Sequence, residues 1–219
     1  SLLIFGFFLT ATVDGKPENK KEKYYQAQLD RVKELLQSSQ YDLAIDKGQE
    51  LLSWCKKEAP QELDRQAGIY LSIALAYYRK KEYSQAVEIS HKGIDAAKTN
   101  ADKYWFLLSG LQSNLALIYR ASKNFKEAET NFKEALEIRL KNYPKLHPSI
   151  GYLYADLSEL YAEMKEYEQA IAQLAKSNEV YKVFFPEDHP EFAINYRQMG
   201  NIFFQLKKYE NAESVYLKA

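Results

Sequence analysis

Apolar and polar positions follow one another along most of this chain with helical spacing, and the whole pattern recurs at a fixed interval. An aromatic residue followed three positions later by Ala occurs five times, at Tyr41 and Ala44, Tyr83 and Ala86, Phe125 and Ala128, Tyr167 and Ala170, and Tyr209 and Ala212. Each pair stands 42 residues after the previous one, as Tyr83 stands after Tyr41. A fixed period of this length predicts a repeat protein.

A first helix of the repeat, helix A, is predicted from the residues before each aromatic. Apolar residues recur ten and six positions upstream, beside a position that is mostly small. These residues are Ile73, Leu115, Leu157 and Met199; Leu35, Tyr77, Tyr119, Tyr161 and Phe203; and Val32, Ala74, Ala116, Ser158 and Gly200. Apolar positions four apart beside a small one form one helix face that packs closely against a neighbour. Arg31 breaks this pattern, so the first repeat is weak.

A second helix, helix B, is predicted to begin near the aromatic, after a short polar break such as residues 121–124. A loop this short makes the second helix antiparallel to the first. The Ala of helix B then lies where only a methyl group fits between the paired helices. A larger side chain at Ala128 or Ala170 should cost roughly 1–3 kcal/mol through overpacking.

Units of this kind, with a small residue, then Tyr, then Tyr-x-x-Ala after a turn, resemble tetratricopeptide repeats, as in 157–161 followed by 167–170. The long period, with His-Pro at 147–148 and 189–190, is similar to the kinesin-light-chain type, although only Asn114 stands where that type carries paired Asn. The resemblance covers residues 25–219. It implies an all-α fold, a right-handed superhelical solenoid of antiparallel helix pairs.

This register divides the chain into an N-terminal part and a repeat domain. Residues 1–13 are interpreted as the remnant of a signal peptide or membrane anchor, and residues 14–24 as a polar linker. The repeats are expected at about 25–63, 64–105, 106–147, 148–189 and 190–219, with the last one truncated.

The apolar run at residues 2–13 leaves the compartment open. It is shorter than the ~20 residues that span a bilayer, but it suits the hydrophobic region of a secretory signal. The tail of a transmembrane helix and a capping helix on the first repeat are the alternatives. A signal or anchor would place the repeats outside the cytoplasm, and a capping helix would leave them cytoplasmic. Because the chain opens with Ser1 and ends within a helix B, we expect a fragment of a longer protein.

Composition argues against several classes of function. The 30 basic and 30 acidic residues give zero net charge, which is unlike a general nucleic-acid binder. The single Cys55 excludes an internal disulfide and is expected in the core. His147 and His189 precede Pro, which favours the first turn of a helix, so they are interpreted as helix starts and not as metal ligands. No cofactor or metal is expected.

Catalysis has little support in the sequence. No phosphate-binding loop or nucleophile motif occurs. Asp156, Glu159 and Glu163 form a carboxylate cluster on one predicted helix, which could serve acid–base chemistry or a divalent ion. Such a face is more often solvated or meets a basic partner. A non-enzyme is therefore predicted.

Stacked repeats present a concave wall built from successive A helices. Ten side chains are expected to line it: Tyr78, Asn114, Leu117, Arg120, Tyr152, Asp156, Glu159, Arg197, Gln198 and Asn201. By resemblance to the family, an extended peptide or a partner's helix binds there. The Asn114 and Asn201 amides could pair with a ligand backbone, and Arg120 and Arg197 could hold a carboxylate in a bidentate fork.

The predicted function is thus a non-catalytic scaffold that binds a protein or peptide, with no nucleic acid, and with a membrane only through the N-terminal segment. The alternative is the extracytoplasmic sensory part of a larger bacterial signal-transduction regulator with a histidine-kinase or DNA-binding output. A third hypothesis, an enzyme using the carboxylate cluster, requires turnover that is lost on Glu159→Gln.

Overall fold

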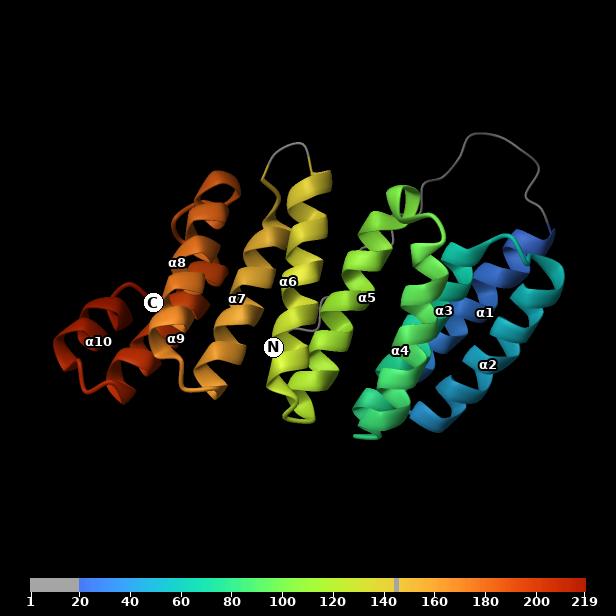
Figure 1. The fold of residues 1–219 in the computed structure, drawn as a ribbon, viewed down its shortest axis with the longest axis horizontal. Helices are drawn as coiled ribbons and strands as arrows, with labels where there is room; N and C mark the ends of the chain where they lie inside the picture. The colour runs from blue at the N-terminus through green and yellow to red at the C-terminus, as the bar shows by residue number, and fades with distance from the viewer. Residues whose placement is uncertain (1–19, 144–145) are drawn as a thin grey trace. The chain divides into compact units, whose positions relative to one another are not determined.

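The computed structural model describes residues 20–143 and 146–219, and within them the chain is built from helices without strands (Figure 1). The ten helices of these residues are α1 (Lys20–Gln37), α2 (Tyr41–Glu58), α3 (Leu63–Arg79), α4 (Tyr83–Lys98), α5 (Ala101–Ala121), α6 (Phe125–Asn142), α7 (Pro148–Glu163), α8 (Tyr167–Phe184), α9 (Pro190–Gln205) and α10 (Tyr209–Tyr216). The predicted A and B helices alternate along them. Among these helices, none is long and apolar enough to cross a membrane. The signal or anchor predicted at residues 1–13 lies outside the described residues.

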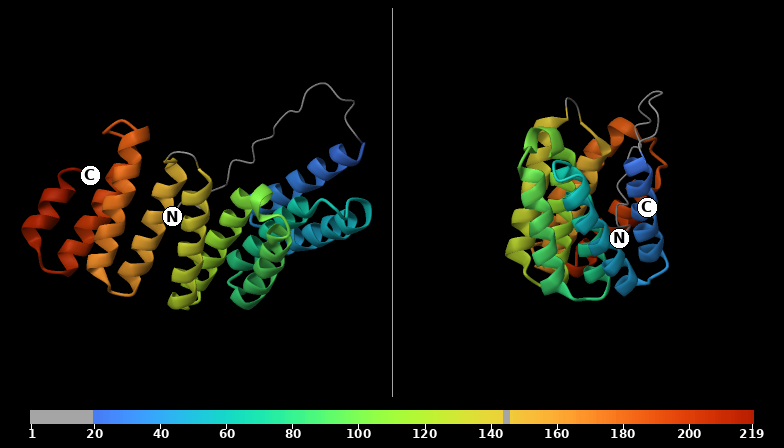
Figure 2. Two further views of the ribbon diagram at one scale, coloured as in Figure 1. Left: turned by 45° about the horizontal axis from the view of Figure 1, so that its top comes forward. Right: turned by 90° about the vertical axis from the view of Figure 1, so that its right-hand side faces the viewer.

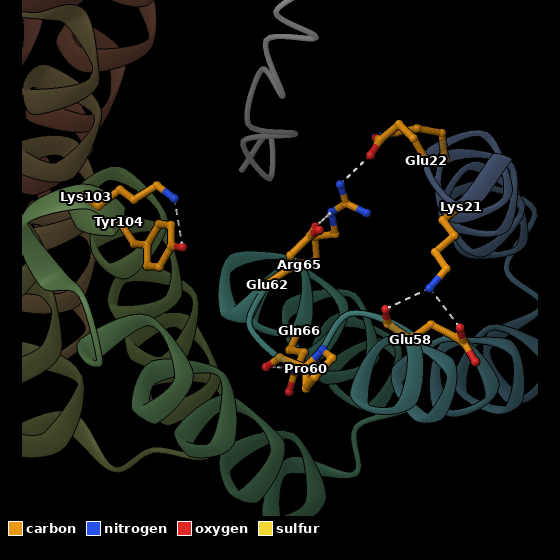
Figure 3. A network of polar contacts seen from close by, with 10 residues as sticks. Lys21, Glu22, Glu58, Pro60, Glu62, Arg65, Gln66, Lys103 and Tyr104 are labelled. Carbon is orange, nitrogen blue, oxygen red and sulfur yellow. Dashed lines mark hydrogen bonds and ion pairs between the residues drawn. The ribbon is translucent and has the colours of Figure 1, made fainter. Parts of the chain in front are cut away.

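Helix α1 begins earlier than expected, at Lys20, inside the segment 14–24 that was predicted to be a linker. Its first turn is held by side chains from other helices (Figure 3). Lys21 pairs with Glu58 of α2 at 3.0 Å, and Glu22 pairs with Arg65 of α3. These long-range ion pairs extend the helix into a polar segment whose composition alone predicts a linker.

The helices fall into two compact units, one ending at Leu111 and the other comprising Gln112–Ala219. In the first unit, α1, α2 and α3 share an apolar core around Leu35, Leu51 and Ile73. Cys55 is fully buried in this core, which confirms its predicted place.

The second unit contains the C-terminal part of α5 and helices α6 to α10. Its core gathers around Phe132, Leu160 and Leu174, all fully buried. Ala128 and Ala170 also have no exposed surface, as predicted for the small position of helix B. The pairs α7 with α8 and α9 with α10 run antiparallel (Figures 1 and 2).

Every turn from an A helix to a B helix has the same geometry. A residue with positive φ follows helix A at Ser39, Lys81, Lys123, Lys165 and Lys207. In the fourth repeat, the Lys165 N–H donates to the Ala162 carbonyl and the Glu166 N–H to the Tyr161 carbonyl. This is the Schellman arrangement, which satisfies the last carbonyls of a helix and ordinarily uses glycine at the left-handed position. Because this turn is the same in every repeat, each helix B begins at the same position of the 42-residue repeat.

The two His-Pro sequences start helices α7 and α9, as predicted. His147 is extended and its Nδ1 accepts a hydrogen bond from the Ser149 N–H at 3.2 Å, with Pro148 in the first turn. His189 does the same for the Glu191 N–H at 3.4 Å. Each imidazole also stacks on an aromatic ring four residues earlier: the His147 and Tyr143 ring centroids are 4.2 Å apart, and those of His189 and Phe185 are 3.9 Å apart. The histidines are structural caps.

Candidate binding face

Nine of the ten predicted wall residues lie in the second unit, on three A helices, and we call these nine the A-helix face. Helix α5 carries Asn114, Leu117 and Arg120; α7 carries Tyr152, Asp156 and Glu159; and α9 carries Arg197, Gln198 and Asn201. The tenth, Tyr78, lies on α3 in the first unit, with its ring centroid 6.1 Å from that of Tyr83.

The repeat places these residues in rows across the helices. Asn114, Asp156 and Gln198 occupy one repeat position, each 42 residues from the next, and all three have polar side chains that can accept hydrogen bonds. One turn further along each A helix, the equivalent position is held by Leu117, Glu159 and Asn201. The face therefore contains a polar row beside a mixed one.

Glu159 links the three A helices. Its Oε2 accepts a hydrogen bond from Arg120 Nη1 of α5 at 2.8 Å, and its Oε1 accepts one from Gln198 Nε2 of α9 at 3.0 Å. The Arg120 side chain is 14% exposed and that of Glu159 is 30% exposed, so the pair is largely withdrawn from water. Charge-assisted bonds in such surroundings are stronger than exposed ones.

The Arg120 guanidinium is engaged within the chain rather than left open to a ligand. Besides Glu159, it lies 3.6 Å from Glu163 through Nε, and Lys123 pairs with Glu163 at 2.9 Å. The carboxylate that Arg120 was expected to take from a ligand is supplied by α7. Two of the three acids of the predicted cluster, Glu159 and Glu163, are thus neutralised by cations of α5 and of the turn after it.

Asp156 differs from its acidic neighbours. No hydrogen bond or ion pair joins it to another described residue, although Arg120 and Arg139 are near enough to act on its charge. Burial, followed by the charge of Glu159, raises the pKa of the Asp156 carboxyl to about 7 against the opposing effect of the two arginines. Arg139 Nη1 of α6 donates instead to the Ser149 carbonyl at 2.7 Å. Asp156 is therefore a half-buried carboxyl without a hydrogen-bond donor among the described residues.

Gln198 also has an unmet acceptor. Its Nε2 donates to Glu159, but its Oε1 is buried and accepts no hydrogen bond from a described residue. A buried acceptor left without a donor costs ~1–3 kcal/mol. Asn201, by contrast, has its Oδ1 occupied by the Tyr216 hydroxyl at 2.7 Å.

The remaining residues define the edges of the face. The Tyr152 ring packs on Tyr181 of α8 with centroids 5.4 Å apart, and burial and the neighbouring Glu191 raise its pKa. Arg197 is exposed and forms no ion pair with a described residue. Leu117 is half-buried beside the second core.

Sequence reasoning missed two contributors to this face, Arg139 and Tyr216. Arg139 stands in helix B at the repeat position of Tyr181, and both are buried. The charged side chain of Arg139, at a position that is aromatic one repeat later, could have indicated this contribution from the sequence. Tyr216 gave none, because its hydroxyl reaches Asn201 from another helix.

Comparison with known families bears on this architecture. Two family models described as tetratricopeptide repeat match the chain, one over residues 107–182 and one over residues 195–219. The first match spans α5 to α8 and the second covers most of α9 with α10, so both include parts of the A-helix face.

Solved structures of low sequence identity share the fold. BtubC (BKLC) from P. vanneervenii superposes with a TM-score of 0.75 at 18% identity, over 84% of this chain and 73% of that one. A putative kinesin light chain with nearly identical TPR-like repeats from Podospora anserina gives 0.74 at 16% identity, over 89% and 92%. A STAND protein with a tetratricopeptide repeat sensor from Pyrococcus horikoshii gives 0.73 at 20% identity, over 89% of this chain and 28% of that one.

No curated protein matches the chain in sequence. The structural likenesses therefore establish the fold, a superhelical solenoid of helix pairs, and the family models identify its repeats. With the 42-residue register and the shared turn geometry, the family models identify tetratricopeptide repeats in this chain, at residues 107–182 and 195–219.

Proposed function

We propose that this protein is a non-catalytic scaffold and that its A-helix face binds an extended peptide or a helix of a partner protein. Tetratricopeptide-repeat folds generally serve as protein-interaction scaffolds. Successive A helices of stacked repeats form the extended surface that such proteins use for binding.

The observation that supports this face most directly is the bridge made by Glu159. By holding Arg120 of α5 and Gln198 of α9, it fixes the side chains of three A helices before a partner arrives. Preorganised groups lose less entropy on binding, which leaves more of the interaction energy for affinity. Around the bridge, Asn114, Tyr152 and Arg197 offer an amide, an aromatic ring and an exposed cation to a ligand.

The test uses side chains that lie outside the Glu159 bridge. Asn114→Ala, Tyr152→Ala and Arg197→Ala are combined in one variant, and binding to an array of acetylated 12-residue peptides is compared with that of the unaltered protein. We expect at least a tenfold loss of binding with the helical circular dichroism retained. The matched control replaces three exposed residues of B helices, Lys126→Ala, Glu137→Ala and Glu168→Ala, and should bind as the unaltered protein does.

Peptide binding that survives in the triple variant would refute the assignment of the face. Loss of binding in the B-helix control would place the contact on the other surface of the repeats. Loss of helicity would call for the single variants, of which exposed Arg197→Ala is the least disruptive to packing.

A further inference from the structure

Two acceptors on the A-helix face have no donor among the described residues, and they occupy the same repeat position on neighbouring A helices. One is the half-buried Asp156 carboxylate of α7, which forms no hydrogen bond with a described residue, and the other is the buried Gln198 Oε1 of α9. Both adjoin Glu159, which is hydrogen-bonded to Gln198 Nε2 and acts on the charge of Asp156. The unmet groups therefore belong to one small region of the face.

Among the described residues, the two arginines that act on the charge of Asp156 are directed elsewhere. Arg120 is held by Glu159 and by Glu163, and Arg139 donates to the Ser149 carbonyl. Asp156, at the centre of the polar row, therefore forms no ion pair with a described residue. A neutral hydroxyl partner would bring one donor, whereas an ammonium brings three and a guanidinium five.

We infer that Asp156 and Gln198 together receive a basic side chain, a lysyl ammonium or an arginyl guanidinium, from the segment bound on the A-helix face. This inference rests on the proposed function and adds the chemical class of its ligand. The cation donates to the Asp156 carboxylate and to Gln198 Oε1, while Gln198 Nε2 keeps its hydrogen bond to Glu159.

Charge explains why a basic group is selected over an acidic one. A carboxylate entering this region would meet Asp156 and Glu159 together, and like charges at short range cost several kcal/mol of affinity. The raised pKa of Asp156 has a consequence for pH. A proton and a basic side chain compete for the same carboxylate, so binding of the basic segment weakens as the pH falls below about 7.

The experiment measures preference at a single position of a peptide. Acetylated and amidated peptides that carry Lys, Arg, Gln or Glu at one fixed position, in otherwise degenerate sequence, are bound to the full chain at pH 8. Asp156→Asn removes the charge and keeps the shape. Asp95→Asn, an exposed acid of α4, is the charge-matched control. Gln198→Met removes the second acceptor without changing the charge.

We expect Lys and Arg peptides to bind the unaltered protein at least tenfold more tightly than Gln peptides, with the preference lost in Asp156→Asn and kept in Asp95→Asn. Gln198→Met should reduce the preference by a smaller factor. A basic preference that persists in Asp156→Asn overturns the inference. Peptide binding without any basic preference overturns it while leaving the proposed function standing, and absence of binding by every peptide overturns both. Circular dichroism melting of each variant separates a loss of fold from a loss of contact.

Discussion

The link between Arg120 and Glu159 can be tested as a source of stability as well as of binding geometry. The perturbation is a double-mutant cycle in which Arg120→Met removes the charge and keeps the apolar stem, and Glu159→Gln removes the charge and keeps an oxygen for Gln198. Each single variant breaks the same 2.8 Å bond between Nη1 and Oε2. The cycle then isolates their coupling from other effects of either substitution.

The magnitude follows from the separation of the charges and from their exposure. Two unit charges 2.8 Å apart attract with about 1.5 kcal/mol at the permittivity of water and about 6 kcal/mol at an effective value of 20. Desolvation cancels much of this, and exposed pairs retain about 0.2–1 kcal/mol. With side chains 14% and 30% exposed, this pair lies between the surface and buried classes. We expect a coupling free energy of about 1–2 kcal/mol.

The assay is urea unfolding at pH 7, followed by far-ultraviolet circular dichroism, for the unaltered protein, both single variants and the double variant. A second cycle on Glu88 and Lys92 of α4 serves as the control. This pair is 2.6 Å apart but 67% and 48% exposed, so its coupling should be much smaller than that of Arg120 and Glu159. A coupling for Arg120 and Glu159 no larger than that of the control would show that the bridge does not hold the A helices together.

Three further predictions address the turns, the packing and the pH response. Lys165→Gly should raise the free energy of unfolding by about 1 kcal/mol in chemical denaturation, because Lys165 has a φ of 63° that glycine adopts without strain; a lower stability would contradict the turn geometry. Gly151→Ala should lower the free energy of unfolding by about 1–3 kcal/mol, because a Cβ there would lie 2.4 Å from the Tyr181 ring. Gly110→Ala, where a Cβ would meet nothing within 4 Å, should be neutral or slightly stabilising. Equal effects of the two substitutions would refute the close approach of Gly151 to Tyr181. Burial, followed by the charge of nearby Arg139, lowers the pKa of His147. The stabilisation that neutral His147 gives to the folded state is therefore complete above the ordinary pKa of about 6.5, and it is lost as the pH falls through the lowered pKa. His147→Asn should keep a cap acceptor and flatten the stability profile between about pH 7 and 5, and an unchanged profile would exclude His147 as the titrating group.

The repeats could be predicted because their evidence is local and strictly periodic. The aromatic and Ala of each helix B keep one spacing, and the structure buries Ala128 and Ala170 completely, as that spacing requires. The start of α1 could not be predicted in this way. Its first turn depends on Glu22 meeting Arg65, a residue far along the chain that composition does not bring near.

The same distinction applies to the A-helix face. Register alone predicts that Asn114, Asp156 and Gln198 form one row, because a row is a property of the backbone. It does not predict which charges neutralise each other, because the long side chain of Arg120 reaches Glu159 on the next A helix. The groups that have no partner within the described residues can therefore be identified only from the structure. On the A-helix face, Asp156 and Gln198 Oε1 have no hydrogen-bond donor among the described residues, and such groups are the ones whose chemistry a partner has to match.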